Sequence, residues 1–192
     1  MSRQTSLPGF QPSVATDRLF LAIFPDPGMA AALATLAAAQ CAAHGLRGRP
    51  VQPGRLHVTL FHLGDTVGLR QEVVDAVSVA ASRVEMAAFE LAFDQVGSFN
   101  GRRDKLPFVL RAHGGNAPLH ALHAALATEL REVGLGRFAA APFEPHVTLA
   151  YDTRTVVMQD VAPLAWQARE FVLVHSLLGQ TRHVPLGRWR LA

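Results

Sequence analysis

Cysteine and lysine are nearly absent from this sequence of 192 residues, which contains one of each, Cys41 and Lys105. A single cysteine excludes an internal disulfide and a cysteine-based metal site. We therefore expect a cytoplasmic protein.

Long hydrophobic segments are also missing. The longest apolar stretch, residues 28–43, is rich in alanine and is too short and too weakly hydrophobic to span a bilayer. Residues 1–16 lack the charged start and apolar centre of a signal peptide. We expect no membrane association, a disordered leader over residues 1–16, and one domain over residues 17–192 that acts as a monomer.

Two common catalytic motifs are absent as well. The chain has neither the Gly-x-Ser-x-Gly turn of many serine hydrolases nor a glycine-rich phosphate loop. The net charge is only +3, and the basic side chains are almost all arginine, whose planar guanidinium suits phosphate. Proteins that bind long nucleic-acid duplexes usually carry a larger positive charge. The small net charge is therefore more consistent with a small anionic substrate or the end of an RNA strand.

What the sequence does contain is the tetrapeptide His-Val-Thr-Leu twice, beginning at His57 and again at His146. Each copy has an apolar, β-branched setting typical of a strand. Side chains alternate along a strand, so His57 shares a face with Thr59, and His146 shares a face with Thr148. Two such strands facing one site would supply two imidazoles and two hydroxyl donors.

These residue types suit the opening of a cyclic phosphate without a metal. One imidazole can take a proton from water while the other protonates the departing sugar oxygen. A threonine hydroxyl on the same face can stabilise charge on the phosphate. A partly buried histidine beside an ordinary threonine would explain one copy, but two copies 89 residues apart favour a functional pair.

Apolar periodicity and turn residues predict an α+β protein made of two similar halves. In each half, a strand and a helix precede a motif strand. The expected helices span residues 29–43, 69–84 and 116–133, and the expected strands other than the motif strands span residues 18–24, 89–96, 107–112, 170–178 and 185–191.

The segments around the two motifs, residues 55–65 and 142–152, resemble the two-histidine phosphoesterase superfamily. Within it the chain is most similar to the bacterial family of 2'-5' RNA ligases, or RNA 2',3'-cyclic phosphodiesterases. Residues 18–25, 93–99 and 171–176 match in kind, so the resemblance covers nearly the whole predicted domain.

The resemblance implies two pseudo-symmetric lobes, each an antiparallel sheet with outer helices, around a central cleft. It implies that His146 activates water, that His57 protonates the 3' oxygen, and that Thr59 and Thr148 bind the phosphate. The reaction implied is hydrolysis of a 2',3'-cyclic phosphate to a 2'-phosphate without metal or cofactor, on an RNA 3' end or a small nucleotide. Some relatives also join RNA ends reversibly through a 2'-5' linkage.

One position departs from the family pattern. Many members carry a phosphate-binding arginine where this chain has Tyr151. Strand alternation places Tyr151 on the face opposite His146, unless the strand bulges. Cations in predicted loops that could compensate are Arg102, Arg103, Lys105 and Arg182, although a solvated surface charge is the simpler interpretation of each one.

Other residues are ranked lower. Phe61 is expected on the His57 face, where it would either stack on a base or pack in the core. His175 and its neighbour Ser176 are expected to line the cleft. His62 is expected on the opposite face, in a structural role. His120 and His123 have a spacing that could ligate zinc, but an exposed helix face is the better interpretation.

Two alternatives remain open. A non-catalytic RNA-end or nucleotide-binding module could keep the fold without the chemistry, and an enzyme of this fold could act on another small cyclic phosphate, such as an ADP-ribose derivative. A binding module needs no pair of titratable groups, so the two intact His-Thr pairs favour an enzyme.

Overall fold

The computed structural model describes residues 14–102 and 104–192, so most of the predicted disordered leader, residues 1–13, lies outside the described residues. Thr16, at the end of that leader, is already held by the sheet. Its amide donates to the Thr66 carbonyl at 2.9 Å, and its carbonyl accepts from the Leu178 amide at 2.8 Å. None of the helices in the described part of the chain is both long and apolar enough to cross a membrane.

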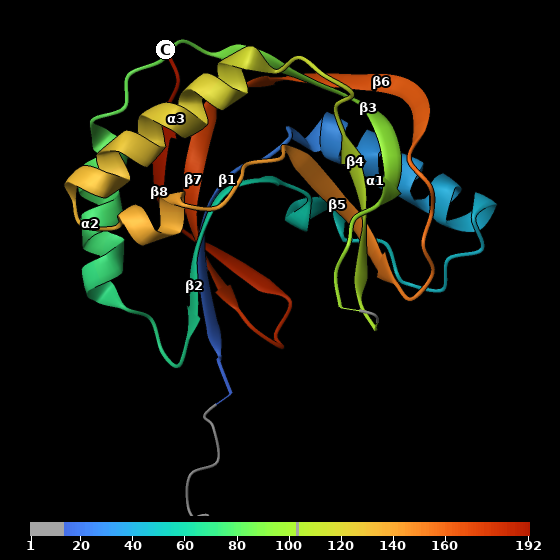
Figure 1. The fold of residues 1–192 in the computed structure, drawn as a ribbon, viewed down its shortest axis with the longest axis horizontal. Helices are drawn as coiled ribbons and strands as arrows, with labels where there is room; N and C mark the ends of the chain where they lie inside the picture. The colour runs from blue at the N-terminus through green and yellow to red at the C-terminus, as the bar shows by residue number, and fades with distance from the viewer. Residues whose placement is uncertain (1–13, 103) are drawn as a thin grey trace, which may run out of the picture.

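The described residues form eight strands, three α-helices and two short 3-10 helices (Figure 1). The strands are β1 (Asp17–Ile23), β2 (Val58–Thr66), β3 (Phe89–Ser98), β4 (Leu106–Arg111), β5 (His146–Asp152), β6 (Gln159–Ala168), β7 (Glu170–Leu177) and β8 (Arg182–Arg190). The helices are α1 (Pro27–Ala43), α2 (Gln71–Ser82), α3 (Ala117–Glu132), η1 (Pro53–Arg55) and η2 (Gly136–Ala139).

The sequence predicted all of the α-helices and all of the strands except β6. That strand was missed because most of its side chains are at least partly exposed and because Pro163 interrupts it. Helix α1 begins at Pro27, two residues earlier than expected, because Asp26 caps it: its carboxylate accepts from the Met29 amide at 2.9 Å.

The strands form one antiparallel sheet in the order β6-β3-β4-β5-β2-β1-β7-β8. The sheet consists of two four-stranded halves, with β2 and β5 side by side in the middle. Those two strands are joined by one residue pair, Val58 with Val147. The predicted α+β fold with two similar halves is confirmed, and the halves meet edge to edge through their motif strands.

The helices cross between the halves. Helix α1 lies between β1 and β2 in sequence but packs against β5 and β6 of the other half. Helix α3, which follows β4, contacts β3 of its own half, and it also packs with α2 and places His123 against Phe61 of β2 in the other half (Figure 1). Each half of the chain therefore helps to cover the sheet of the other, which ties the two halves together.

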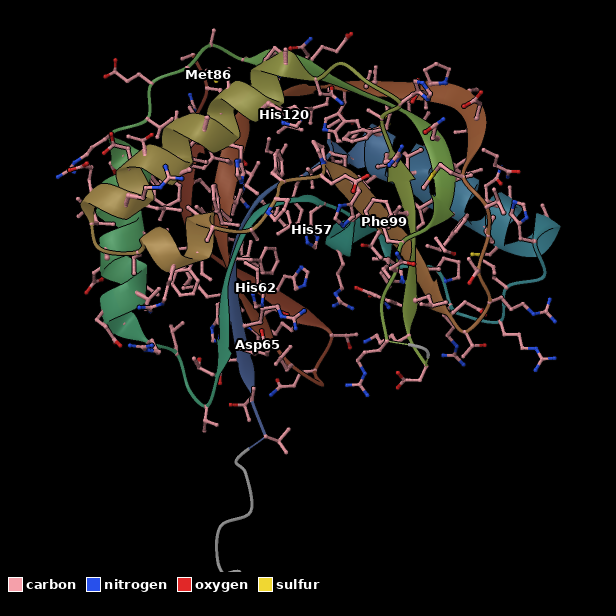
Figure 2. The ribbon with its side chains drawn as sticks, in the orientation of Figure 1. His57, His62, Asp65, Met86, Phe99 and His120 are labelled. Atoms are coloured by element: carbon pink, nitrogen blue, oxygen red, sulfur yellow. The ribbon has the colours of Figure 1, made fainter. Side chains whose placement is uncertain are left out.

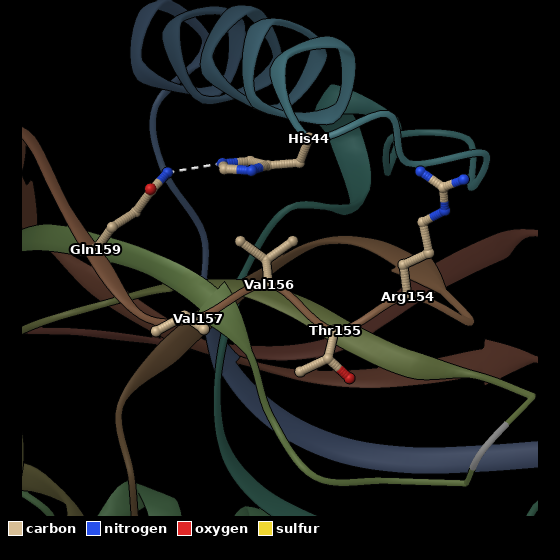
Figure 3. Close-up of a pocket in the computed structure, with 6 residues that line it drawn as sticks. All are labelled: His44, Arg154, Thr155, Val156, Val157 and Gln159. Atoms are coloured by element: carbon tan, nitrogen blue, oxygen red, sulfur yellow. Dashed lines mark hydrogen bonds between the residues drawn. The ribbon is translucent and has the colours of Figure 1, made fainter.

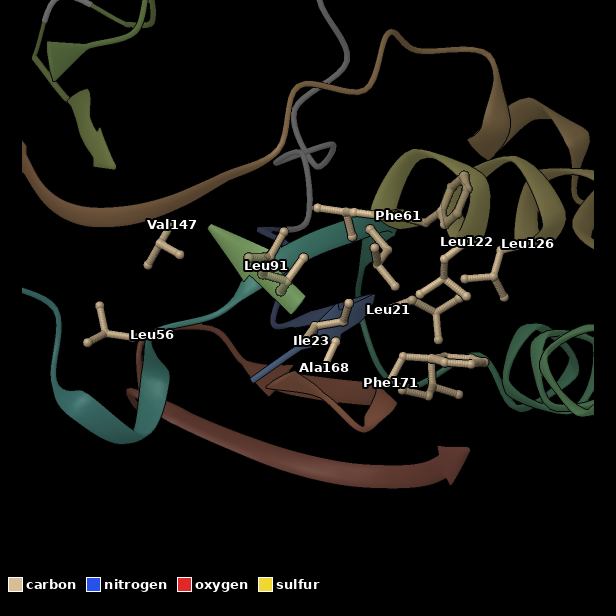
Figure 4. Close-up of a cluster of buried hydrophobic side chains, with 14 of the residues drawn as sticks. Leu21, Ile23, Leu56, Phe61, Leu91, Leu122, Leu126, Val147, Ala168 and Phe171 are labelled. Carbon is tan, nitrogen blue, oxygen red and sulfur yellow. The ribbon is translucent and has the colours of Figure 1, made fainter. Parts of the chain in front are cut away.

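The two faces of the sheet differ. One face and the helices form the main core, to which Leu21, Leu91, Leu122 and Phe171 contribute from β1, β3, α3 and β7 (Figure 4). The second cluster of buried side chains contains Phe20, Ala22, Val172 and Val174, with Phe24 packed against it. No helix residue belongs to this second cluster, and we call the side of the sheet that carries it the helix-free face.

His123 is part of the packing beneath α3, which corrects its predicted position on an exposed helix face. Its ring lies between those of Phe61 and Phe143, at centroid distances of 4.2 Å and 4.0 Å, and is nearly parallel to both. Burial, assisted by the charges of His120 and Arg131, lowers the pKa of His123 to about 4. His120, one turn earlier, is exposed as predicted.

The burial of neutral His123 predicts that the folded protein is less stable in acid. Between pH about 6.5 and about 4, unfolded His123 binds a proton that folded His123 does not, so the free energy of unfolding should fall as the pH falls through this range. The variant His123→Phe keeps an aromatic ring in the stack and removes that titration, so its stability should depend less on pH. Urea unfolding across this range measures the effect, with His120→Phe as the matched control. Equal pH dependence in wild type and both variants would contradict the prediction.

Candidate active site at the junction of the two half-sheets

The two motif strands meet at the centre of the sheet. Val58 and Val147 form the pair that joins β2 to β5, and both are fully buried. Along a strand, the residues directly before and after a given residue project to the face of the sheet opposite to that residue's own. The histidine and threonine of each motif flank the paired valine, so all four side chains project to the helix-free face, as predicted for His57, Thr59, His146 and Thr148.

Both motif histidines are held in the same way. The Nδ1 of His57 lies 2.7 Å from the carbonyl oxygen of Arg55, and the Nδ1 of His146 lies 2.7 Å from that of Glu144. A carbonyl oxygen only accepts, so Nδ1 carries a hydrogen in both rings. This leaves Nε2 of each imidazole available for proton transfer.

His57 is the more enclosed of the pair. Its ring stacks on Phe20 at a centroid distance of 4.8 Å and is also 5.5 Å from Phe24. Burial lowers the pKa of His57 to about 4, against the opposing hydrogen bond to the Arg55 carbonyl, and the nearby His183 and His146 lower it further. His57 is therefore a neutral imidazole at pH 7.

A bulge in β2 decides which side chains accompany His57. The β1–β2 register shifts between Thr59 and Phe61, so Leu60 is an extra residue and the alternation reverses beyond it. Phe61 consequently turns into the main core, where it is 3% exposed. The prediction that Phe61 shares the His57 face is wrong, whereas its alternative role in core packing is correct.

The same bulge brings His62 to the helix-free face, where strand alternation predicted the opposite. Figure 2 shows His57, His62 and Asp65 following one another along this part of the chain. The Nε2 of His62 lies 2.9 Å from Asp65, and Arg18 donates to both oxygens of the same carboxylate at 2.7 Å and 2.6 Å. These hydrogen bonds, led by the one from Arg18, lower the pKa of Asp65 to about 2.

A matching bulge occurs in β5. The β4–β5 register shifts between Thr148 and Ala150, so Leu149 is an extra residue. Tyr151 therefore lies on the same side of the strand as His146, the outcome expected if the strand bulges. Tyr151 is 41% exposed, so its hydroxyl is available at the position where the resemblance led us to expect an arginine.

Lys105 is the cation that the structure places against Tyr151: its Nζ lies 4.6 Å from the centre of the phenol ring. Arg102 is exposed and forms an ion pair within its own loop. Arg103 lies outside the described residues, and Arg182 is exposed at the start of β8. Of the described cations proposed to compensate for the missing arginine, Lys105 therefore has the most suitable position.

Arg111 is a second cation beside this site, and sequence reasoning missed it. It pairs with His146 in the β4–β5 register and therefore projects to the same face. Its guanidinium donates to the Glu144 carboxylate. Nothing in the local sequence singles it out, because residues 107–112 have the pattern of an ordinary buried strand.

His175 does not line the helix-free face, contrary to the prediction. It pairs with Leu19 of β1, whose side chain belongs to the main core, and its Nε2 lies 2.5 Å from the carboxylate of Asp17. Its neighbour Ser176 does project to the helix-free face but is only 5% exposed. A hydrogen bond to Asp17 that holds the start of β1 against β7 accounts for His175.

His183 is the histidine from the closing strands that reaches the site. It pairs with Ser176 across β7 and β8, and its ring lies edge-on to His57 with centroids 5.6 Å apart. Burial lowers the pKa of His183 to about 4. The sequence contains no repeat of the motif around His183, so only the pairing of β8 with β7 reveals it.

A separate hollow of about 560 Å³ lies near the end of α1, lined by His44, Arg154, Thr155, Val156, Val157 and Gln159 (Figure 3). The Nε2 of Gln159 donates to His44 there at 2.7 Å. None of the predicted site residues lines this hollow. Among the residues that the structure describes, no three His, Cys, Asp or Glu side chains are grouped so that they could hold a metal ion.

Comparison with known proteins identifies the family of the chain. The model of the 2'-5' RNA ligase superfamily matches residues 25–179. The RNA 2',3'-cyclic phosphodiesterase of Escherichia coli (strain K12) is 32% identical over 151 residues, which are 75% of this chain and 80% of that protein. Crystal structures of E. coli LigT complexed with 3'-AMP and with ATP align at TM-scores of 0.73 and 0.72, with 27% and 26% identity, and each alignment covers 92% of this chain and 99% of LigT. The chain therefore belongs to the 2'-5' RNA ligase superfamily.

Proposed function

We propose that this protein hydrolyses 2',3'-cyclic phosphates, on RNA 3' ends or on nucleotides, to 2'-phosphates. The observation that carries the proposal is the matched pair of imidazoles, each anchored through Nδ1 and each with Nε2 available, at the junction of β2 and β5. The similarity to a relative named RNA 2',3'-cyclic phosphodiesterase and to nucleotide complexes of LigT supports it.

In the proposed step, neutral His57 takes a proton from water at Nε2 while the water oxygen bonds to phosphorus. The bond from phosphorus to the 3' oxygen breaks, and that oxygen takes a proton from the protonated Nε2 of His146. The hydroxyls of Thr59 and Thr148 donate to the non-bridging oxygens, on which charge develops. A 5'-hydroxyl in place of water would give a 2'-5' linkage by the same step.

These roles are the reverse of those that the resemblance implies. The reason is the packing of His57 against Phe20 and Phe24, which favours its neutral form and so suits it to be the base in the free protein. The grip on the phosphate is proposed to come from Lys105 and Arg111, which lie on either side of the place where relatives carry an arginine.

Removal of either histidine tests the site. We expect His57→Ala and His146→Ala each to lower kcat/KM by about 10²- to 10⁴-fold on an oligonucleotide ending in a 2',3'-cyclic phosphate, because each variant loses one proton transfer. The assay is run in EDTA, with His120→Ala, on the outer face of α3, as the control. Undiminished turnover in both variants would refute the site, and binding without turnover by the wild type would favour a non-catalytic nucleotide-binding module.

A substrate whose leaving group needs no proton separates the two roles. On a 3'-deoxynucleoside 2'-(4-nitrophenyl phosphate), nitrophenolate departs unaided, so we expect His146→Ala to retain most of the wild-type rate. His57→Ala should remain impaired, because water still has to lose a proton. Release of nitrophenolate is followed by absorbance. The opposite pattern would restore the roles implied by the resemblance.

The pH dependence of kcat/KM reports the groups that titrate in the free enzyme. We expect a bell-shaped profile whose acid limb lies well below pH 6.5, near the His57 pKa of about 4, because activity falls as His57 takes up a proton. Phe20→Leu removes the stacked ring and should move that limb toward pH 6.5. An acid limb near 6.5 in both proteins would show that His57 is not the base.

A further inference from the structure

A pocket of about 950 Å³ lies on the helix-free face along β7 and β8. Register explains which side chains line it. On β8, His183 pairs with Ser176, Pro185 with Val174, Arg188 with Val172 and Arg190 with Glu170. Paired residues project to the same face, so these β8 side chains share the face that carries Val172 and Val174. The loop after β1, the first turn of α1, the turn at η1 and residues near the end of the chain complete the wall.

The pocket begins at the proposed catalytic base. Two of its lining residues, Phe24 and His183, contact His57 directly, with ring centroids 5.5 Å and 5.6 Å away. The Nδ1 of His183 is buried and has no hydrogen-bond partner among the described residues. A ligand that reaches from the reacting phosphate into this pocket would therefore pass His183.

The two ends of the pocket differ in chemistry. Beside His183 on β8 the lining is apolar, with Pro185 and its partner Val174. The far end carries three arginines, of which Arg188 forms an ion pair with Glu170. Arg169 and Arg190 are exposed and form no ion pair within the described part of the chain.

We propose that this pocket binds the nucleotide on the 5' side of the cyclic phosphate in a single-stranded RNA. The inference rests on the proposed function. A 2',3'-cyclic phosphate uses both free oxygens of the last ribose, so the strand can leave the site only in the 5' direction. An apolar and aromatic wall suits a base, and guanidinium groups beyond it suit the next phosphodiester. The order along β8, His183 and Pro185 first and Arg188 and Arg190 after them, matches the order of those groups along a strand.

The test compares two substrates that end in the same nucleotide 2',3'-cyclic phosphate, a mononucleotide and a hexanucleotide. The wild type should have the higher kcat/KM on the hexanucleotide. In the double variant Arg169→Gln/Arg190→Gln, the ratio of the two values should fall by on the order of tenfold. The slope of log kcat/KM against log salt for the hexanucleotide should also become shallower, by about 0.7 for each phosphate that an arginine no longer neutralises.

Arg131→Gln, on the outer helix α3, removes the same charge away from the pocket and should keep the wild-type ratio and salt slope. Equal ratios in the wild type and the double variant would overturn the pocket assignment, as would an equal fall in the ratio in Arg131→Gln. Absence of wild-type turnover on both substrates would instead refute the proposed function. The hydrolysis of the mononucleotide therefore distinguishes the two failures.

Discussion

The proposed active site depends on one residue pair, Val58 with Val147, because this is where the two half-sheets become one. Each valine is fully buried, and each has a motif histidine on one side and a motif threonine on the other. Separation of this pair would move the two imidazoles apart together with their strands. The crossing of α1 and α3 onto the opposite halves opposes that separation, since the main core is continuous across the junction.

The two bulges are the second constraint. Each adds one leucine directly after a motif threonine, and each reverses the alternation of the strand beyond it. As a result, the side chains five positions after the motif histidines, His62 and Tyr151, turn to the helix-free face. A bulge commonly redirects a side chain beside a functional site. In this protein the same device operates in both halves.

The symmetry of the backbone does not extend to the surroundings of the histidines. His57 packs against Phe20, Phe24 and His183, whereas His146 has Phe99 at its edge with ring centroids 5.0 Å apart. An enclosed imidazole resists protonation, because burial in apolar surroundings penalises the charged form. Different packing around identical tetrapeptides can therefore give one base and one acid, which is what a single displacement at phosphorus requires.

Local sequence patterns predict the helices, most strands and the common face of each His-Thr pair, because these follow from periodicity within a few residues. Tertiary structure decided the rest. Whether an extra leucine becomes a bulge depends on the partner strand, so Phe61 and His62 changed sides relative to simple alternation. Arg111 and His183 entered the site, and His175 left the predicted one, because strand register sets which distant side chains meet. Register is fixed by pairing between segments far apart in the chain, and no local pattern encodes it.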